Sequence, residues 1–293
     1  MGAGGEPVDL LRTLASHGVA ELPPQRVDLE RSRFEVTLPL GGGRGRTVVV
    51  SPGEPGHARV AGANRRLLDV VRHMLRLDED LSEFYVLVAQ EPDLAWAARG
   101  AGRMLRSPTV FEDVVKTVCT TNCAWSATVR MTTALVEQLG DPAPDGRHAF
   151  PSPAALAEAG EDFYREVVRA GYRGPYLRAL ADDIASGTLD LELLNDPELP
   201  DEEVAARLLA LPGVGPYAAA HVMTTSLGRY SRLILDSWTR PQYARIAGRK
   251  AADRTIERRF RRYGRYAGLA FWLYLTRGWI QDEQPAEWLS SPG

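Results

Sequence analysis

The sequence contains few cysteines and few lysines, two residue types that often mark reactive sites. Its 293 residues include two cysteines, Cys119 and Cys123. Two thiols can neither complete a zinc site nor hold an iron–sulfur cluster, so we expect neither cofactor and interpret both cysteines as small buried side chains. The chain has two lysines, Lys116 and Lys250, which limits the amines available for a Schiff-base mechanism.

Long apolar runs are also missing. No stretch approaches the ~20 apolar residues of a membrane span, and the start of the chain lacks a basic flank followed by an apolar segment, so we expect no membrane partner and no secretory signal. The content of 44% hydrophobic and 25% charged residues is typical of a soluble globular protein. The missing span and signal predict a cytoplasmic protein. At this length the chain can bury its own core, which predicts a monomer.

The net charge of −3 hides a separation of sign along the chain. Residues 243–266 hold nine arginines and lysines against two acids, whereas residues 190–203 hold seven acids and no base. Such separation is typical of a protein with one face for an anion and another turned to water. A basic, solvated helix is the alternative, and the charge pattern alone does not distinguish the two.

The hydrophobic pattern changes from alternating to helical along the chain. Phe34, Val36 and Leu38 alternate with polar residues, and the segments GGGRG and TVVV follow, which predicts a β-hairpin. From about residue 62 the apolar spacing becomes helical. The pattern predicts a mainly α fold with a small N-terminal antiparallel sheet, divided into a mixed part over 1–100 and an all-helical body over 101–285.

Two sequence signals predict where particular helices begin. Thr109 and Glu112 have the spacing of a capping box, ahead of an apolar helical segment. Further along, Asp201 is placed to cap another helix, and the segment LPGVGP then turns into a second helix that begins at Pro216. This arrangement predicts a helix-hairpin-helix over about 204–228.

The glycines of this hairpin indicate an anion site. Gly213 and Gly215, which flank Val214, allow the backbone to approach a partner closely, and the unpaired amides at the start of the second helix favour a phosphate. The segment lacks the Gly-Lys-Ser/Thr ending of a P-loop. A plain turn between two helices is the alternative. After the second helix, Asp236 follows an apolar segment at the start of another helix, where an aspartate is usually a cap.

Taken together, LPGVGPYAAAHVM and LILDSW resemble the helix-hairpin-helix DNA glycosylase superfamily. The resemblance implies that Asp236 is the catalytic aspartate and that Gly213, Val214 and Gly215 bind the DNA backbone. In the 8-oxoguanine glycosylases a catalytic lysine precedes this aspartate by 19 residues, and here that position holds Tyr217. Alkylpurine glycosylases carry an aromatic residue there and use water directly. The resemblance therefore implies a monofunctional hydrolase that needs no catalytic cofactor.

Further motifs extend the resemblance over about 34–280. FEDVVKTVCTTNCAWSATVRM is similar to the family segment whose asparagine, here Asn122, enters the space left by a flipped nucleotide. AGYRGPYLRALA is similar to the loop in which Tyr172 would wedge into the base stack and Arg173 would meet the estranged base. Ala127 stands where 8-oxoguanine glycosylases place a second arginine, so a preference for an opposite cytosine is not expected from that contact. For Asn122 and Tyr172, an ordinary helix break and a partly buried loop aromatic are the alternatives.

The resemblance also implies a base pocket and a cation site. RYAGLAFWLYLTRGW is similar to the helix that closes the pocket, where Phe271 and Trp272 would join Tyr217 and His221. Plain core packing is the alternative for these aromatic residues, and for His221 we favour a satisfied core imidazole. Family hairpins bind a monovalent cation through backbone carbonyls, which by position belong to Leu209, Leu211 and Val214, so a structural Na⁺ or K⁺ is predicted.

The expected partner is double-stranded DNA that contains a damaged or modified base, and the expected substrate is an alkylated purine. An aromatic pocket would attract such a cationic base. Asp236, at a helix N-terminus, is expected to stay ionised and to stabilise positive charge on the sugar. Release of 8-oxoguanine or another modified base is the alternative substrate class. A non-catalytic damage-binding protein and a lyase that uses some other amine are the alternative functions.

Overall fold

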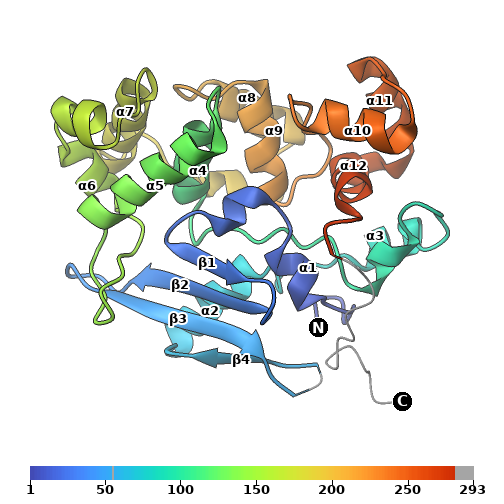
Figure 1. The fold of residues 1–293 in the computed structure, drawn as a ribbon, viewed down its shortest axis with the longest axis horizontal. Coiled ribbons are helices and arrows are strands. Elements are labelled where there is room, and N and C mark those ends of the chain that lie inside the picture. The colour runs from blue at the N-terminus through green and yellow to red at the C-terminus, as the bar shows by residue number, and fades with distance from the viewer. Residues whose placement is uncertain (55, 281–293) are drawn as a thin grey trace.

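A four-stranded antiparallel sheet lies at one side of the molecule, and helices form the rest (Figure 1). This description rests on a computed structural model and covers residues 1–54 and 56–280. The strands follow one another in space as they do in sequence: β1 (Gln25–Asp28), β2 (Arg33–Pro39), β3 (Gly45–Pro52) and β4 (Ala58–Ala61). The predicted hairpin is confirmed as β2 and β3, with Val36 opposite Val48 and the apolar side chains facing the core.

Helices make up most of the ordered elements, which confirms the predicted fold class. None of the described helices is long and apolar enough to cross a membrane. The α-helices are α1 (Leu10–Leu14), α2 (Arg65–Met74), α3 (Ser82–Val88), α4 (Val110–Thr120), α5 (Trp125–Leu139), α6 (Pro153–Glu158), α7 (Arg173–Ala185), α8 (Asp201–Leu209), α9 (Pro216–Thr225), α10 (Thr239–Ala247), α11 (Asp253–Phe260) and α12 (Ala267–Thr276). Shorter helical turns are η1 (Gly18–Glu21), η2 (Ala95–Arg99), η3 (Phe163–Val167), η4 (Glu192–Asn195) and η5 (Arg261–Tyr266).

The two predicted helix starts are close to correct in position but differ in their side-chain contacts. Thr109 Oγ1 accepts from the Glu112 amide at 3.2 Å, as a capping box requires. The Glu112 carboxylate, however, accepts from Lys116 Nζ at 2.6 Å, so only half of the box forms. Asp201 is the first residue of α8 and accepts from Arg229 Nη1 at 2.8 Å. It is therefore an ion-pair partner, and the prediction that it caps α8 is wrong.

Three hydrophobic clusters hold the molecule together. The first joins the sheet to α2, with residues such as Phe34 and Met74 fully buried. The second lies among α4, α5, α7, α8 and α9. The third combines residues 81–104 with residues 220–275. The clusters thus do not follow the proposed division at residue 100, because α3 and η2 pack against the C-terminal helices. Residues 281–285 of the proposed helical body lie outside the described residues.

Candidate active site and nucleic-acid interface

The hairpin joins α8 to α9 through a turn in which two glycines do different things. Gly213 has φ +79°, and a Cβ there would lie 2.8 Å from the Tyr176 ring. Gly215 has extended backbone (φ −97°) and is exposed, with no atom within 4 Å of an added Cβ. Gly213 is therefore needed for the turn itself, whereas Gly215 leaves open space at the start of α9, where a backbone phosphate could approach.

Val214 and the two leucines of the hairpin are placed differently. The Val214 side chain is buried, and its amide donates to the Leu211 carbonyl at 3.2 Å. Val214 can thus meet DNA only through its backbone, and its amide already has an acceptor. The Leu209 side chain is 44% exposed. A monovalent cation held by the carbonyls of Leu209, Leu211 and Val214 stays a prediction, with one of the three oxygens already accepting an amide.

Asp236 lies where an extended segment turns into α10. Its Oδ1 accepts from the amides of Trp238 at 2.9 Å and Thr239 at 2.6 Å, while the Asp236 amide donates to Thr239 Oγ1 at 2.8 Å. This reciprocal cap fixes the carboxylate. Because both amides use Oδ1, the half-buried side chain keeps Oδ2 available among the described residues. The geometry combines the cap function with an oxygen that is free for a reacting group.

Tyr217 and His221 lie one turn apart on α9. The Tyr217 hydroxyl is 3.4 Å from Thr120 Oγ1. Burial raises the pKa of Tyr217, the bond to Thr120 lowers it, and the negative charge of Asp236 raises it further. His221 is buried behind Tyr217, with ring centroids 5.8 Å apart and Nδ1 3.3 Å from Thr225 Oγ1. Burial lowers the pKa of His221 to about 3. The core interpretation of His221 therefore fits the structure better than a pocket wall does.

The neighbouring aromatic residues of α12 face different surroundings. Phe271 is fully buried between Tyr243 and Phe260, with centroids 6.4 and 5.2 Å away. It belongs to the core, so the expectation that it lines the base pocket is not met. Trp272 is 7% exposed, and its Nε1 donates to the Ser16 carbonyl at 2.7 Å. Adjacent helix positions point about 100° apart, which explains why one residue meets the core and the other its edge.

Trp272 is part of an aromatic cluster that sequence reasoning missed. Its ring lies 5.6 Å from that of Trp238 and 6.0 Å from that of Trp279. These two partners are 40% and 42% exposed, so the cluster reaches the surface two residues beyond Asp236. The segment DSWT contains the signal, an aromatic residue two positions after a capping aspartate, but its partners on α12 and beyond could not be inferred from spacing.

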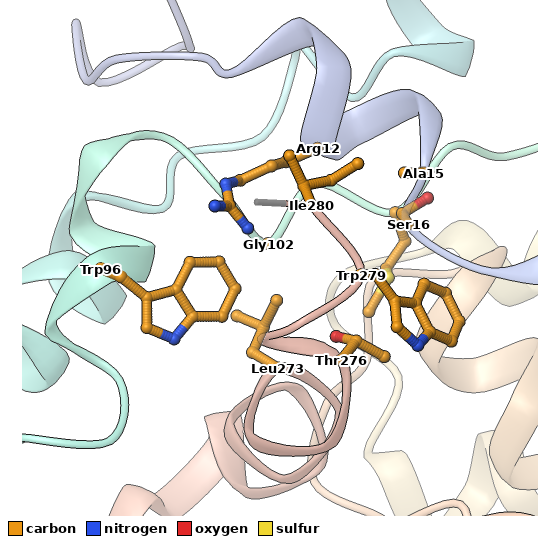
Figure 2. Close-up of a pocket in the computed structure, with 10 residues that line it drawn as sticks. Arg12, Ala15, Ser16, Trp96, Gly102, Leu273, Thr276, Trp279 and Ile280 are labelled. Carbon is orange, nitrogen blue, oxygen red and sulfur yellow. The ribbon is translucent and has the colours of Figure 1, made fainter. Parts of the chain in front are cut away.

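A small cavity lies beside this cluster, between α1, η2 and α12 (Figure 2). Figure 2 shows Trp279 on one side and Trp96 on the other, with Leu273 between them. The Arg12 guanidinium lies 4.5 Å from the centre of the Trp96 ring. Residues of α1 and of the end of α12 therefore line the same cavity, together with Trp279, which follows α12.

Asn122 and Tyr172 come together from separate turns. Asn122 is exposed between α4 and α5 with φ +47°, and its Nδ2 donates to the Tyr172 hydroxyl at 3.3 Å. Tyr172 is 50% exposed. Two exposed side chains at adjoining turns are suited to enter a base stack. Arg173, in contrast, is buried and donates to the Thr121 carbonyl, so the expectation of a free arginine facing the estranged base is not met.

Several arginines of the basic segment have acidic partners from distant parts of the chain. Arg259 lies 3.3 Å from Asp93, Arg262 lies 2.7 Å from Glu91, and Arg265 bonds to Glu83. These pairs join α11 and η5 to α3 and the residues that follow it. The basic segment therefore serves partly to hold the third hydrophobic cluster together, and its charge overstates what is available to DNA.

Neither cysteine belongs to a metal centre in the described part of the chain. Cys119 is buried, and burial raises its pKa to about 12, whereas Cys123 is only half-buried. No group of three or more His, Cys, Asp or Glu side chains among the described residues is arranged to hold a metal ion.

Comparison with known proteins assigns the fold. The crystal structure of an 8-oxoguanine glycosylase/lyase from Clostridium acetobutylicum superposes on this chain with a TM-score of 0.73 at 23% identity, over 92% of this chain and 93% of the other. A 3-methyladenine DNA-glycosylase from Archaeoglobus fulgidus gives 0.73 at 21% identity, over 94% and 97%. These likenesses show a shared fold. The chain shares the fold of these DNA glycosylases and is similar to members of the helix-hairpin-helix DNA glycosylase superfamily.

The sequence match to a known protein covers less of the chain than the structural matches do. The chain is 31% identical to the N-glycosylase/DNA lyase OGG1 of Arabidopsis thaliana over 224 residues, which is 71% of this chain. The match spans 60% of the length of that relative. No protein-family model matches the sequence. The similar proteins include both 8-oxoguanine glycosylases and 3-methyladenine glycosylases.

Proposed function

We propose that the protein is a DNA glycosylase that flips a damaged or modified base out of double-stranded DNA and hydrolyses its N-glycosidic bond. The observation that carries the proposal is the Asp236 carboxylate, held by two backbone amides through one oxygen with the other oxygen available. Tyr217 stands 19 residues before Asp236, and the negative charge of Asp236 raises the pKa of the Tyr217 hydroxyl. A protein that only senses damage has no use for a fixed carboxylate at this place.

The chemistry follows from the charge that develops on the sugar. Departure of the base leaves positive charge on the deoxyribose, and a fixed carboxylate stabilises that charge and orients water for attack. Asp236 supplies both effects. Asn122 and Tyr172, which meet at 3.3 Å, fill the gap left by the extruded nucleotide. The hairpin amides near Gly215 position the DNA backbone, and a monovalent cation held by hairpin carbonyls would stiffen the same turn.

Hydrolysis without lyase activity is supported by the position of both lysines. Lys116 is fully buried and bonded to Glu112, with Gln25 at 3.0 Å. Lys250 is exposed between α10 and α11, outside the hairpin. Neither amine stands at the position 19 residues before Asp236, which holds Tyr217, and a Schiff base at the sugar needs an amine poised there.

An alkylated purine is the substrate class that the aromatic cluster favours. Trp238, Trp272 and Trp279 form a surface close to Asp236, and indole rings attract cationic bases by stacking and cation–π interaction. An 8-oxoguanine substrate is the second candidate, because the Arabidopsis relative is an OGG1 protein. The protein acts as a monomer in this proposal.

Two experiments test the proposal. The first incubates the protein with duplexes that each carry one defined lesion and scores the free base. We expect release of alkylated purines, and release of no base from any duplex would contradict the enzyme assignment.

The second experiment adds borohydride during the reaction. We expect no trapped covalent adduct and intact abasic strands until alkali or heat is applied, whereas a trapped band lost on mutating Lys116 or Lys250 would establish a lyase.

A further inference from the structure

The Arg173 side chain lies between the turn that carries Asn122 and the residue Tyr172. Its Nε is 3.3 Å from Thr121 Oγ1, its Nη1 donates to the Ala170 carbonyl at 3.3 Å, and its Nη2 donates to the Thr121 carbonyl. Each of the three guanidinium nitrogens therefore has a protein acceptor. With 6% of the residue exposed, little of this arginine faces solvent.

The contacts of Arg173 are of a kind that is costly to give up. Thr121 directly follows the last residue of α4, where carbonyls lack partners within the helix and a cation is favoured by the helix dipole. The same guanidinium lies 4.5 Å from the centre of the Tyr172 ring, a cation–π distance. A movement of Arg173 toward DNA would leave a carbonyl unpaired at a helix end and remove this ring contact at the same time.

The turn between α4 and α5, which Arg173 contacts, contains a residue in an unfavourable backbone conformation. Asn122 has φ +47°, in the left-handed region that asparagine tolerates better than most residues but that is still less favourable than extended or helical backbone. Arg173 fixes the residue before it through the carbonyl and hydroxyl of Thr121. The turn and Tyr172 therefore form one preassembled unit that a single guanidinium joins.

We propose that Arg173 is a positioning residue for Asn122 and Tyr172, and that the protein binds damaged sites without reading the base opposite the lesion. This inference rests on the proposed function. Ala127, on α5, is too short to contact that base in place of an arginine. The nearby Arg130 is 3.3 Å from the Arg169 carbonyl. Arg130 is exposed and bonds through one nitrogen, whereas all three guanidinium nitrogens of Arg173 have protein acceptors. In this arrangement Arg173 does not offer the planar donor that base recognition by arginine uses.

The test measures binding to duplexes that contain a tetrahydrofuran abasic analogue opposite C, A, G or T, together with plain duplex. The analogue has no base, so differences among the four duplexes report only contacts with the opposite base. We expect the four Kd values to agree within about threefold. For Arg173→Ala we expect all four Kd values to rise by roughly tenfold. The Kd for plain duplex should change less than about twofold, because Asn122 and Tyr172 enter the base stack only where a base is missing or flipped out.

A matched control and a conservative variant sharpen this result. Arg178→Ala removes an exposed arginine from the same helix, 3.8 Å from Asp182, and should leave all five Kd values unchanged. Arg173→Lys keeps the charge but offers one nitrogen instead of three, and we expect partial rescue. Hydrogen exchange of the free protein should show faster exchange at the amides of 121–124 in Arg173→Ala than in Arg178→Ala.

Two outcomes would overturn the inference. One is a preference of more than about tenfold for one opposite base, since the protein would then read that base, and loss of the preference in Arg173→Ala would assign the contact to Arg173. The other is unchanged binding of Arg173→Ala to all four abasic duplexes. If that variant does not fold, the four-duplex comparison with the parent and Arg173→Lys still decides. Failure of the proposed function is distinct, because it appears as absence of base release with the abasic binding pattern intact.

Discussion

The segment 213–239, which runs from the hairpin to Asp236 and the start of α10, and the basic segment over 243–266 lie close to each other in the chain but are fixed by different partners. Around Asp236, both amides that hold the carboxylate come from within three residues. In the basic segment, Arg262 and Arg265 instead pair with Glu91 and Glu83, which lie 171 and 182 residues earlier in the chain. Local partners can be inferred from spacing, whereas distant partners depend on the folded arrangement.

The difference matters for function because it separates the charge of a segment from the charge that a ligand meets. The Asp236 carboxylate is held through Oδ1 by two backbone amides, and its Oδ2 stays available. The arginines of the basic segment, in contrast, are partly neutralised by acids from another segment. The charge counted along the basic segment therefore exceeds the charge that a ligand would meet there.

The largest effect is expected at Asp236. In Asp236→Asn the amide oxygen can still accept from the Trp238 and Thr239 amides, so the cap and the fold should persist. The variant loses the negative charge that stabilises the sugar cation. We expect base release to fall by roughly a thousandfold or more while DNA binding is kept or tightened. Single-turnover excision and binding to the same duplex measure the two effects.

The control for this variant is Asp182→Asn, which removes an exposed carboxylate from α7. It should excise at the parental rate. Undiminished base release by Asp236→Asn would show that the Asp236 carboxylate only caps α10 and has no catalytic role.

What could be predicted from the sequence follows the same division. The β2–β3 hairpin, the helix-hairpin-helix turn and the helix start at Asp236 all depend on partners a few residues away, and each was expected in about the right place. The pocket role of Phe271 was implied by the resemblance, and the sequence does not say that this face of α12 packs against Tyr243 and Phe260 in the core. Trp238 was missed because its partners come from α12 and beyond.

Arg173 shows the same limit at a single residue. Its motif places it beside Tyr172, which is correct, but the three acceptors that hold its guanidinium come from the end of α4 and from Ala170. No spacing rule links α4 to α7. Its direction therefore required the structure.

A second, smaller effect tests a distant contact in the core. His17, in the N-terminal part, lies 5.8 Å from His221 on α9, and both are buried. Burial lowers the pKa of His17 to about 4, opposed by its bond to the Leu105 carbonyl and aided by Arg76 and Lys116. Folded-state pKa values below the unfolded value mean that stability is full above about pH 6.5 and is lost as the pH falls toward 4.

We expect each of these histidines to cost on the order of 2 kcal/mol of unfolding free energy between pH 7 and pH 5. In His17→Gln the amide can replace the bond to Leu105 but has no proton to gain in this range, so its stability should fall less steeply. Urea unfolding at both pH values measures the difference. Equal losses for the parent and His17→Gln would show that the pair does not contribute to acid sensitivity.

The next effect separates the two hairpin glycines. Gly215→Val places a side chain in open space on the predicted phosphate path, so the affinity for damaged and plain duplex should fall together, by roughly tenfold, with stability unchanged. Gly213→Ala should instead lower stability, because φ +79° is unfavourable for alanine and its Cβ would meet Tyr176. Thermal unfolding and duplex binding distinguish them. Parental affinity in Gly215→Val would contradict a phosphate site at this turn.

The smallest effect is expected in the basic segment and decides whether paired arginines still contribute to DNA binding. Arg265 bonds to Glu83, whereas Lys250 is exposed between α10 and α11. If exposed basic residues supply the phosphate contacts, Lys250→Gln should lower the slope of log K against log salt by about one unit. Arg265→Gln should change that slope little and lower the unfolding free energy by less than about 1 kcal/mol, as is usual for an exposed ion pair. Binding to plain duplex at several salt concentrations provides the slopes. An equal decrease in both variants would show that Glu83 does not withhold Arg265 from DNA, because a phosphate can compete for a guanidinium that is held only at the surface.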